Sequence, residues 1–168
     1  MKCLLLVLVL GVAGALGQGD LITEGAWNTY YMAATDGSLI RENGPMRIYM
    51  RQIDCGETCA TLTFVFYVRE NGVCSKRSVV ATEIENGRYV VEFKGKNYFL
   101  INRVSEFEIL ISDDHRNTGQ QSIVLGLVGR APEVTEEGKL ALTRVAEQSG
   151  IPSENIVYIA DTDTCPPV

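Results

Sequence analysis

The sequence predicts an all-β domain with one flanking helix, and three observations lead to this fold class. Runs of alternating apolar and polar residues recur at short, regular spacing from residue 27 to residue 130. Turn signals separate these runs, and Asn71-Gly72 and Asn86-Gly87 are typical of two-residue hairpins. After Arg130 the period changes to that of a helix. Eight short antiparallel strands in sequence predict an up-and-down barrel or a sandwich, and a closed barrel leaves no strand edge free.

The first residues have the features of a secretory signal peptide. Met1-Lys2 gives a positive start, the apolar run over residues 4–12 is too short to span a bilayer comfortably, and Ala15-Leu16-Gly17 offers small residues before a cleavage site. The alternative is a buried N-terminal helix. We therefore expect residues 1–17 to be a signal peptide, and residues 18–168 to form a single secreted domain with a sizeable core.

The charge balance limits the classes of partner. The chain has a formal net charge of −6 and no basic patch, so nucleic acid is not an expected partner. No apolar run after Gly17 is long enough to cross a bilayer, so membrane insertion is not expected either.

Trp27 stands at the entry to the first expected strand. Its indole can close one end of a β core with a large apolar surface, and Gly25 allows a positive φ or a close approach of the backbone.

The expected strands follow one another with short connections. The polar segment 113–119 is interpreted as a turn, and His115 within it as a solvated loop residue rather than a catalytic base. The expected strands cover residues 28–35, 46–54, 62–69, 75–83, 89–93, 98–104, 107–112 and 122–130.

A helix and a last strand complete the chain. Thr135 can cap a helix whose first turn holds Glu136 and Glu137, and Gly150 ends it. Residues 156–160 form a short apolar run typical of a ninth strand. Asp161 and Asp163 could suggest calcium, although a solvated tail is the simpler interpretation.

The cysteines agree with export to an oxidising compartment. Cys3 leaves with the signal peptide, and the remaining four allow three pairings. A local bridge between Cys55 and Cys59 is plausible in a polar turn, and Cys74 would then pair with Cys165. A zinc site would need several histidines or close C-x-x-C pairs, and the sequence has a single histidine and no C-x-x-C pair, so we expect no metal.

Several short motifs carry a resemblance to a known family. With these motifs in order, the sequence resembles the lipocalins, most closely their odorant-binding and pheromone-carrier branch, which includes aphrodisin-like proteins. The resemblance implies an eight-stranded barrel with the helix outside it, the bridges Cys55–Cys59 and Cys74–Cys165, and Arg130 placed over the Trp27 ring at the closed end. The motifs are Gly25-Ala26-Trp27, Asn43-Gly44-Pro45, Cys55-x-x-x-Cys59, Asn71-Gly72-Val73-Cys74, Gly126-Leu127-Val128-Gly129-Arg130 and the segment 150–156.

The alternation and the register of that family together place a set of mostly apolar residues inward. They could fill a dry core, but the resemblance favours a cavity with a soft, adaptable wall of methionines and aromatic rings. The expected lining residues are Met46, Ile48, Met50, Leu62, Phe64, Phe66, Ala81, Val91, Phe93, Phe99, Ile109, Ile111, Val124, Gly126 and Val128.

Such a wall selects ligands by size and apolarity. It offers no fixed charge for a carboxylate and no obvious acid–base pair. Asn97 or Tyr31 could supply one polar contact, although Asn97 is also typical of a turn. We expect a secreted, non-catalytic carrier of a small hydrophobic molecule (an odorant, pheromone, phenol or fatty-acid-like compound) that needs no cofactor.

Two other functions stay open at this point. One is a nutritive secreted protein of the milk-whey type, whose cavity matters little. The other is a lipocalin-type isomerase, which by resemblance would use a free cysteine in the cavity. The sequence also leaves open whether the chain pairs as a homodimer.

Overall fold

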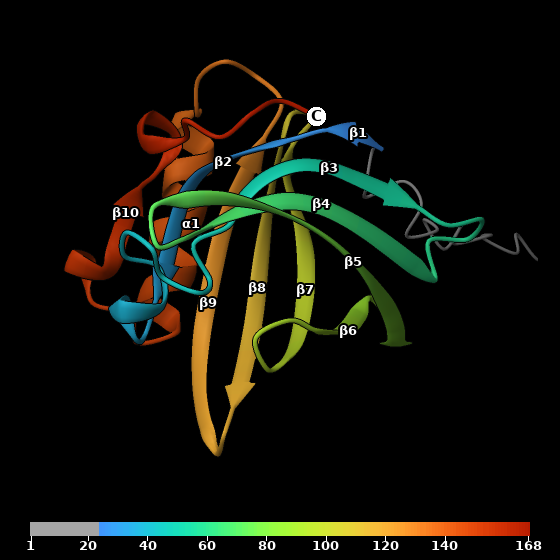
Figure 1. Ribbon diagram of the computed structural model, residues 1–168, viewed down its shortest axis with the longest axis horizontal. Coiled ribbons are helices and arrows are strands. Elements are labelled where there is room, and N and C mark those ends of the chain that lie inside the picture. Colours follow the sequence, from blue (N-terminus) through green and yellow to red (C-terminus); the bar gives the residue numbers. More distant parts are fainter. Residues whose placement is uncertain (1–23) are drawn as a thin grey trace, which may run out of the picture.

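A single antiparallel sheet of ten strands dominates the computed structural model, which describes residues 24–168 (Figure 1). The predicted signal peptide therefore lies outside the described residues. The strand order is β1-β3-β4-β5-β6-β7-β8-β9-β2-β10. The strands are β1 (Gly25–Ala26), β2 (Asn28–Ala34), β3 (Tyr49–Cys55), β4 (Thr61–Glu70), β5 (Val73–Glu85), β6 (Arg88–Glu92), β7 (Lys96–Ser105), β8 (Glu108–Asn117), β9 (Gln120–Gly129) and β10 (Ile156–Tyr158).

The sheet closes into a barrel because β1 and β2, which are consecutive in the chain, pair with strands from opposite ends of the sheet. Only Trp27 separates β1 from β2; β1 pairs with β3, and β2 pairs with β9. The backbone N–H of Trp27 donates to the carbonyl oxygen of Arg51 at 3.0 Å, so the pairing with β3 extends one residue beyond β1. Counted as one strand, β1 and β2 complete the expected eight-stranded barrel, and β10 is the expected ninth strand.

The hairpin turns follow the chemistry of their residues. Asn71 and Gly72 connect β4 to β5 with φ values of 52° and 79°. Two consecutive positive φ values match the right-handed twist of the flanking strands, and Asn and Gly tolerate them best. The Asn-Gly signal therefore predicted this hairpin correctly.

The predicted turn over residues 113–119 is wrong. β8 continues to Asn117 and β9 begins at Gln120, so that only Thr118 and Gly119, with φ values of 48° and 79°, form the turn. The strand persists because the inward alternation of Ile109 and Ile111 continues through two polar residues, Asp113 and His115, which are both buried.

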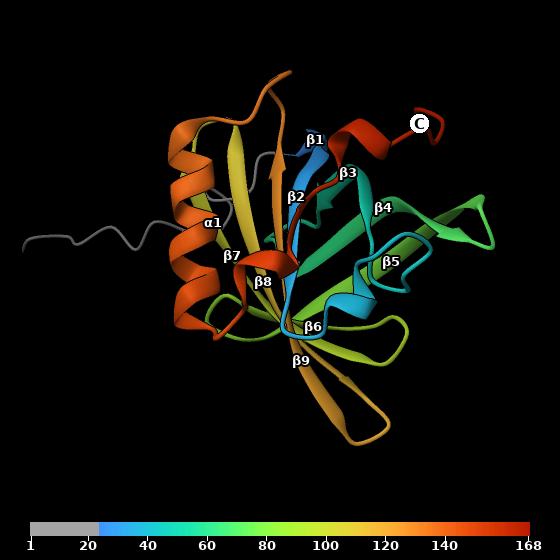
Figure 2. The same ribbon diagram turned by 90° about the vertical axis from the view of Figure 1, so that its left-hand side faces the viewer.

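The helix α1 (Glu136–Gln148) lies on the outer face of the barrel against β7, β8 and β9 (Figure 2). The Thr135 hydroxyl caps it by accepting a hydrogen bond from the Gly138 N–H at 3.0 Å. Gly138 is required here because an added Cβ would lie 2.5 Å from an oxygen of Glu108, which is completely buried and accepts a hydrogen bond from the Thr135 N–H.

The C-terminal tail is fixed to the barrel rather than solvated. β10 pairs with β2, and Asp163 forms a largely buried ion pair with Arg51 at 2.6 Å. The structure joins Cys74 to Cys165 and Cys55 to Cys59, which is the pairing that the resemblance implies.

Two further findings concern residues 24–168. None of their helices is both long and apolar enough to cross a membrane. They also contain no group of three or more His, Cys, Asp or Glu side chains arranged to hold a metal ion.

Candidate functional site

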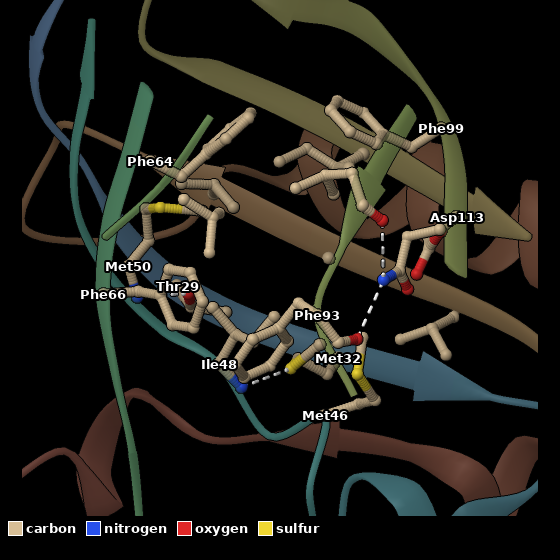
Figure 3. A pocket seen from close by; sticks show the side chains of 17 residues that line it. Thr29, Met32, Met46, Ile48, Met50, Phe64, Phe66, Phe93, Phe99 and Asp113 are labelled. Carbon is tan, nitrogen blue, oxygen red and sulfur yellow. Dashed lines mark hydrogen bonds between the residues drawn. The ribbon is translucent and has the colours of Figure 1, made fainter. Parts of the chain in front are cut away.

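A cavity of about 100 Å³ lies inside the barrel (Figure 3). Strands from every part of the barrel contribute to its wall, so that the site depends on the fold as a whole. The lining residues are Thr29, Met32, Met46, Ile48, Met50, Phe64, Phe66, Val79, Val91, Phe93, Asn97, Phe99, Ile111, Asp113, Val124, Gly126 and Val128.

Aromatic rings and thioethers shape most of the wall. Phe66 and Phe93 meet edge to face with their ring centres 5.0 Å apart, and Phe64 meets Phe99 in the same way at 5.6 Å. The sulfur of Met32 accepts a hydrogen bond from a backbone N–H at 3.3 Å. The phenylalanines are thus held by one another, whereas thioether side chains can adapt to a guest.

Most of the residues predicted to line a cavity do lie along it, and Leu62, Ala81 and Ile109 are the exceptions. These three are almost completely buried in the core cluster that also contains Trp27. Alternation predicted their inward direction correctly. It carried no information on how far the core is filled, so their assignment to the cavity wall is corrected here.

Sequence reasoning missed four lining residues: Thr29, Met32, Val79 and Asp113. A β-bulge between Thr29 and Tyr31 shifts the register of β2, so that simple alternation does not give its inward face. The Thr29 hydroxyl accepts a hydrogen bond from the Met50 N–H at 3.0 Å and thereby links β2 to β3. Asp113 was missed because its segment was interpreted as a turn.

Asn97 and His115 form a buried polar pair across β7 and β8. Asn97 Nδ2 donates to the carbonyl oxygens of Phe93 and Val91 at 2.9 and 3.3 Å, so its Oδ1 faces Nδ1 of His115 at 2.8 Å. Burial lowers the pKa of His115, against the opposing effect of Asp114. His115 is therefore a neutral structural residue that donates to Asn97, and the interpretation as a solvated loop residue is wrong.

Asp113 places a carboxyl group in this otherwise uncharged wall. Only 8% of the residue is exposed, and it pairs in register with Phe99 on β7 and Val124 on β9. Burial, and next the charge of Asp114, raise the pKa of Asp113 to about 8. The sequence predicts a wall without a fixed charge, and the structure adds to it one ionisable side chain, Asp113, whose raised pKa favours the uncharged form at neutral pH.

Tyr31 does not line the cavity. It lies among the residues outside the barrel, with its ring centre 4.9 Å from that of Tyr158 on β10. Of the two polar contacts expected from the sequence, only Asn97 lies at the cavity.

Comparison with known proteins gives the same fold and family for nearly the whole described chain. The model of the Lipocalin / cytosolic fatty-acid binding protein family matches residues 24–163. The chain is 36% identical to aphrodisin of Cricetus cricetus, with 98% of both chains covered. It is 35% identical to an odorant-binding protein of Phodopus sungorus, with 85% of this chain and 95% of that protein covered.

Solved structures agree with this result. The crystal structure of aphrodisin, a sex pheromone from female hamster, is similar with a TM-score of 0.82 and 35% identity, covering 85% of this chain and 98% of that one. Bovine odorant-binding protein in complex with undecanal is similar with a TM-score of 0.62 and 28% identity, covering 85% and 92% of the two chains.

Proposed function

We propose, because this chain belongs to the Lipocalin / cytosolic fatty-acid binding protein family, that it is a secreted, non-catalytic carrier of small hydrophobic molecules. The observation that carries the proposal is the cavity, whose wall contains four of the five phenylalanines of the chain. Relatives named odorant-binding proteins, one of them solved with undecanal, support the ligand class.

The binding free energy expected for a small apolar ligand is sufficient for such a role. A ligand of about ten non-hydrogen atoms that contributes roughly 0.5–0.8 kcal/mol per atom would bind in the micromolar range. This affinity allows both loading and release of a volatile compound. The phenylalanine pairs would set the largest guest that fits, and the methionines would adjust to its shape.

The absence of a catalytic role is supported by the chemistry of the wall. Among the described residues, no cysteine lines the cavity, and Cys55, Cys59, Cys74 and Cys165 are held in disulfides. The isomerase alternative requires a free cavity thiol. Counting reactive thiols under denaturing, non-reducing conditions tests it: none is expected in the mature protein, whereas one or more would favour the isomerase.

Secretion is supported by the two disulfides and by the leader-like residues 1–17. N-terminal sequencing of the protein from its source fluid should begin at Gln18. Native mass spectrometry of the same sample would give the number of subunits and so decide between a monomer and the homodimer that the sequence leaves open.

Displacement of a fluorescent apolar probe by odorants, phenols and fatty acids tests the carrier function itself. Gly126→Leu is a matched control, because Gly126 lines the cavity and an added Cβ meets only a methyl carbon of Val128 at 3.9 Å. The added side chain should fill the cavity and abolish binding without unfolding the protein. Failure of every compound to bind the folded wild type would favour the nutritive alternative.

A further inference from the structure

The carboxyl group of Asp113 has no protein partner for one of its two oxygens. Its Oδ1 is buried and accepts no hydrogen bond from any residue in the range 24–168. Buried polar atoms are normally paired, because a buried group that has lost its water without gaining a partner is unfavourable. The residue is more than nine-tenths buried and lies on the cavity wall beside Phe99 (Figure 3).

The neighbouring polar groups are already engaged. Both amide hydrogens of Asn97 are donated to backbone carbonyls, and its oxygen faces His115. The Thr29 oxygen accepts the Met50 N–H, which leaves its O–H as a donor. Among the lining residues, Asp113 alone has a buried side-chain oxygen or nitrogen without a hydrogen-bond partner in the range 24–168, so it is the group whose pairing a polar ligand atom would complete.

No cation is available to Asp113 from the strands around it. Asp114 points to the other face of β8 and is paired with Arg116. On β7 the charged residues Lys96 and Arg103 are exposed, and β9 has no charged residue. His115, on the same face of β8, donates to Asn97. The cavity lining itself contains no other ionisable side chain.

These surroundings favour the protonated carboxyl, in agreement with the raised pKa of Asp113. A carboxylic acid in this state has one O–H to donate. An anionic ligand would find no cation in the cavity, whereas a neutral ligand with a hydrogen-bond acceptor would satisfy the donor.

We propose that Asp113 is the polar anchor of the cavity, and that it donates a hydrogen bond to the single acceptor atom, a carbonyl oxygen or an aromatic nitrogen, of a small and otherwise apolar ligand. The proposal rests on the carrier function above and narrows its ligand class. Fatty-acid anions become poor ligands, and ketones, aldehydes and nitrogen heterocycles become good ones.

The test compares 2-octanone with 2-methyl-1-octene, in which a C=CH2 group replaces the C=O group at nearly the same shape. Calorimetric titration is carried out with the wild type, Asp113→Leu and Asp113→Asn. Asp113→Leu should bind the ketone about tenfold more weakly without losing affinity for the alkene, since one hydrogen bond contributes about that factor. Asp113→Asn keeps a donor and should retain most of the ketone affinity.

The pH dependence supplies a second readout that a packing defect would not imitate. In the wild type, ketone affinity should fall as the pH rises above about 8, where Asp113 loses its proton, while alkene affinity should stay constant. Asp113→Asn should remove this dependence. Asp114→Asn, which changes the adjacent carboxylate on the outer face, should preserve the ketone affinity at pH 6.

Each outcome separates the anchor from the carrier function. If Asp113→Leu changes the ketone and alkene affinities equally, or if ketone binding to the wild type is independent of pH, the anchor assignment is wrong and the carrier function stands. If the folded wild type binds neither compound, the carrier function itself fails. Should Asp113→Leu not fold, the Asp113→Asn titrations across pH still decide the question.

Discussion

The guanidinium carbon of Arg130, directly after β9, lies 4.1 Å from the centre of the Trp27 ring, between β1 and β2. The indole is almost completely buried, and Gly25, two residues before Trp27, has a φ of 118°. Any side chain at Gly25 would be strained, and its Cβ would lie 3.5 Å from the Arg130 side chain. The cation therefore covers the indole at the point between β1, which pairs with β3, and β2, which pairs with β9. The contact links the start of the barrel to the residue that follows its last strand, β9.

A double-mutant cycle tests this contact. Arg130→Met and Trp27→Phe, singly and together, should give a coupling free energy of about 1–2 kcal/mol, because a shielded cation on an indole face contributes that amount. Urea unfolding followed by circular dichroism provides the measurement. If the effects of the two substitutions are additive, the Arg130 charge does not interact with the indole, and its side chain only covers the ring.

Asp113 should make stability depend on pH. Because burial raises its pKa from 3.8 to about 8, the folded protein keeps a proton between these values that the unfolded chain releases. Stability therefore falls as the pH rises through this window. The unfolding free energy of Asp113→Asn minus that of the wild type should increase by roughly 1.4 kcal/mol per pH unit between about pH 5 and pH 7.

Asp114→Asn is the matched control for that measurement, because it leaves the buried carboxyl in place. Its stability should show most of the pH dependence of the wild type. Parallel curves for Asp113→Asn and the wild type would show that the Asp113 carboxyl is ionised in the folded protein at neutral pH.

The two disulfides should differ in what they contribute. Cys74–Cys165 spans a sequence separation of 91 and should stabilise the protein by roughly 4–5 kcal/mol on the loop-entropy model, against about 2 kcal/mol for Cys55–Cys59, with a separation of 4. Paired Cys→Ser variants, compared by thermal unfolding, check this order. A larger loss for the small ring would contradict it.

Phe93 should set an upper limit on ligand size. Its ring lines the cavity and packs edge-on against Phe66. Phe93→Trp should narrow the space, and so weaken bulky odorants by about tenfold or more while changing small phenols little. Probe displacement with a series of increasing ligand size measures the effect. An equal loss for small and bulky ligands would count against the assignment.

The sequence was most informative where turn chemistry and alternation agreed. Asn71-Gly72 marks a hairpin, and the alternating Met46, Ile48 and Met50 all lie along the cavity. The sequence was misleading where polar side chains point into the barrel. Asp113 and His115 continue the inward series of Ile109 and Ile111, yet two buried polar residues next to exposed ones have the composition of a turn.

Two other features had no signal in the pattern. The bulge in β2 changes which residues face inward, so Thr29 and Met32 could not be assigned by alternation. Leu62, Ala81 and Ile109 alternate like true lining residues, but they lie where side chains fill the barrel completely. The boundary between core and cavity depends on packing in three dimensions, which periodicity does not contain.

The methionines allow the most direct test of a ligand-binding cavity. The chain has four, and Met32, Met46 and Met50, all except Met1, line the cavity. In protein labelled with ¹³C at the methionine methyl groups, saturation with 2-methyl-1-octene should shift all three signals in the wild type and none in Gly126→Leu. Unshifted methionine signals in the folded wild type at saturating alkene would contradict a cavity that receives small hydrophobic molecules.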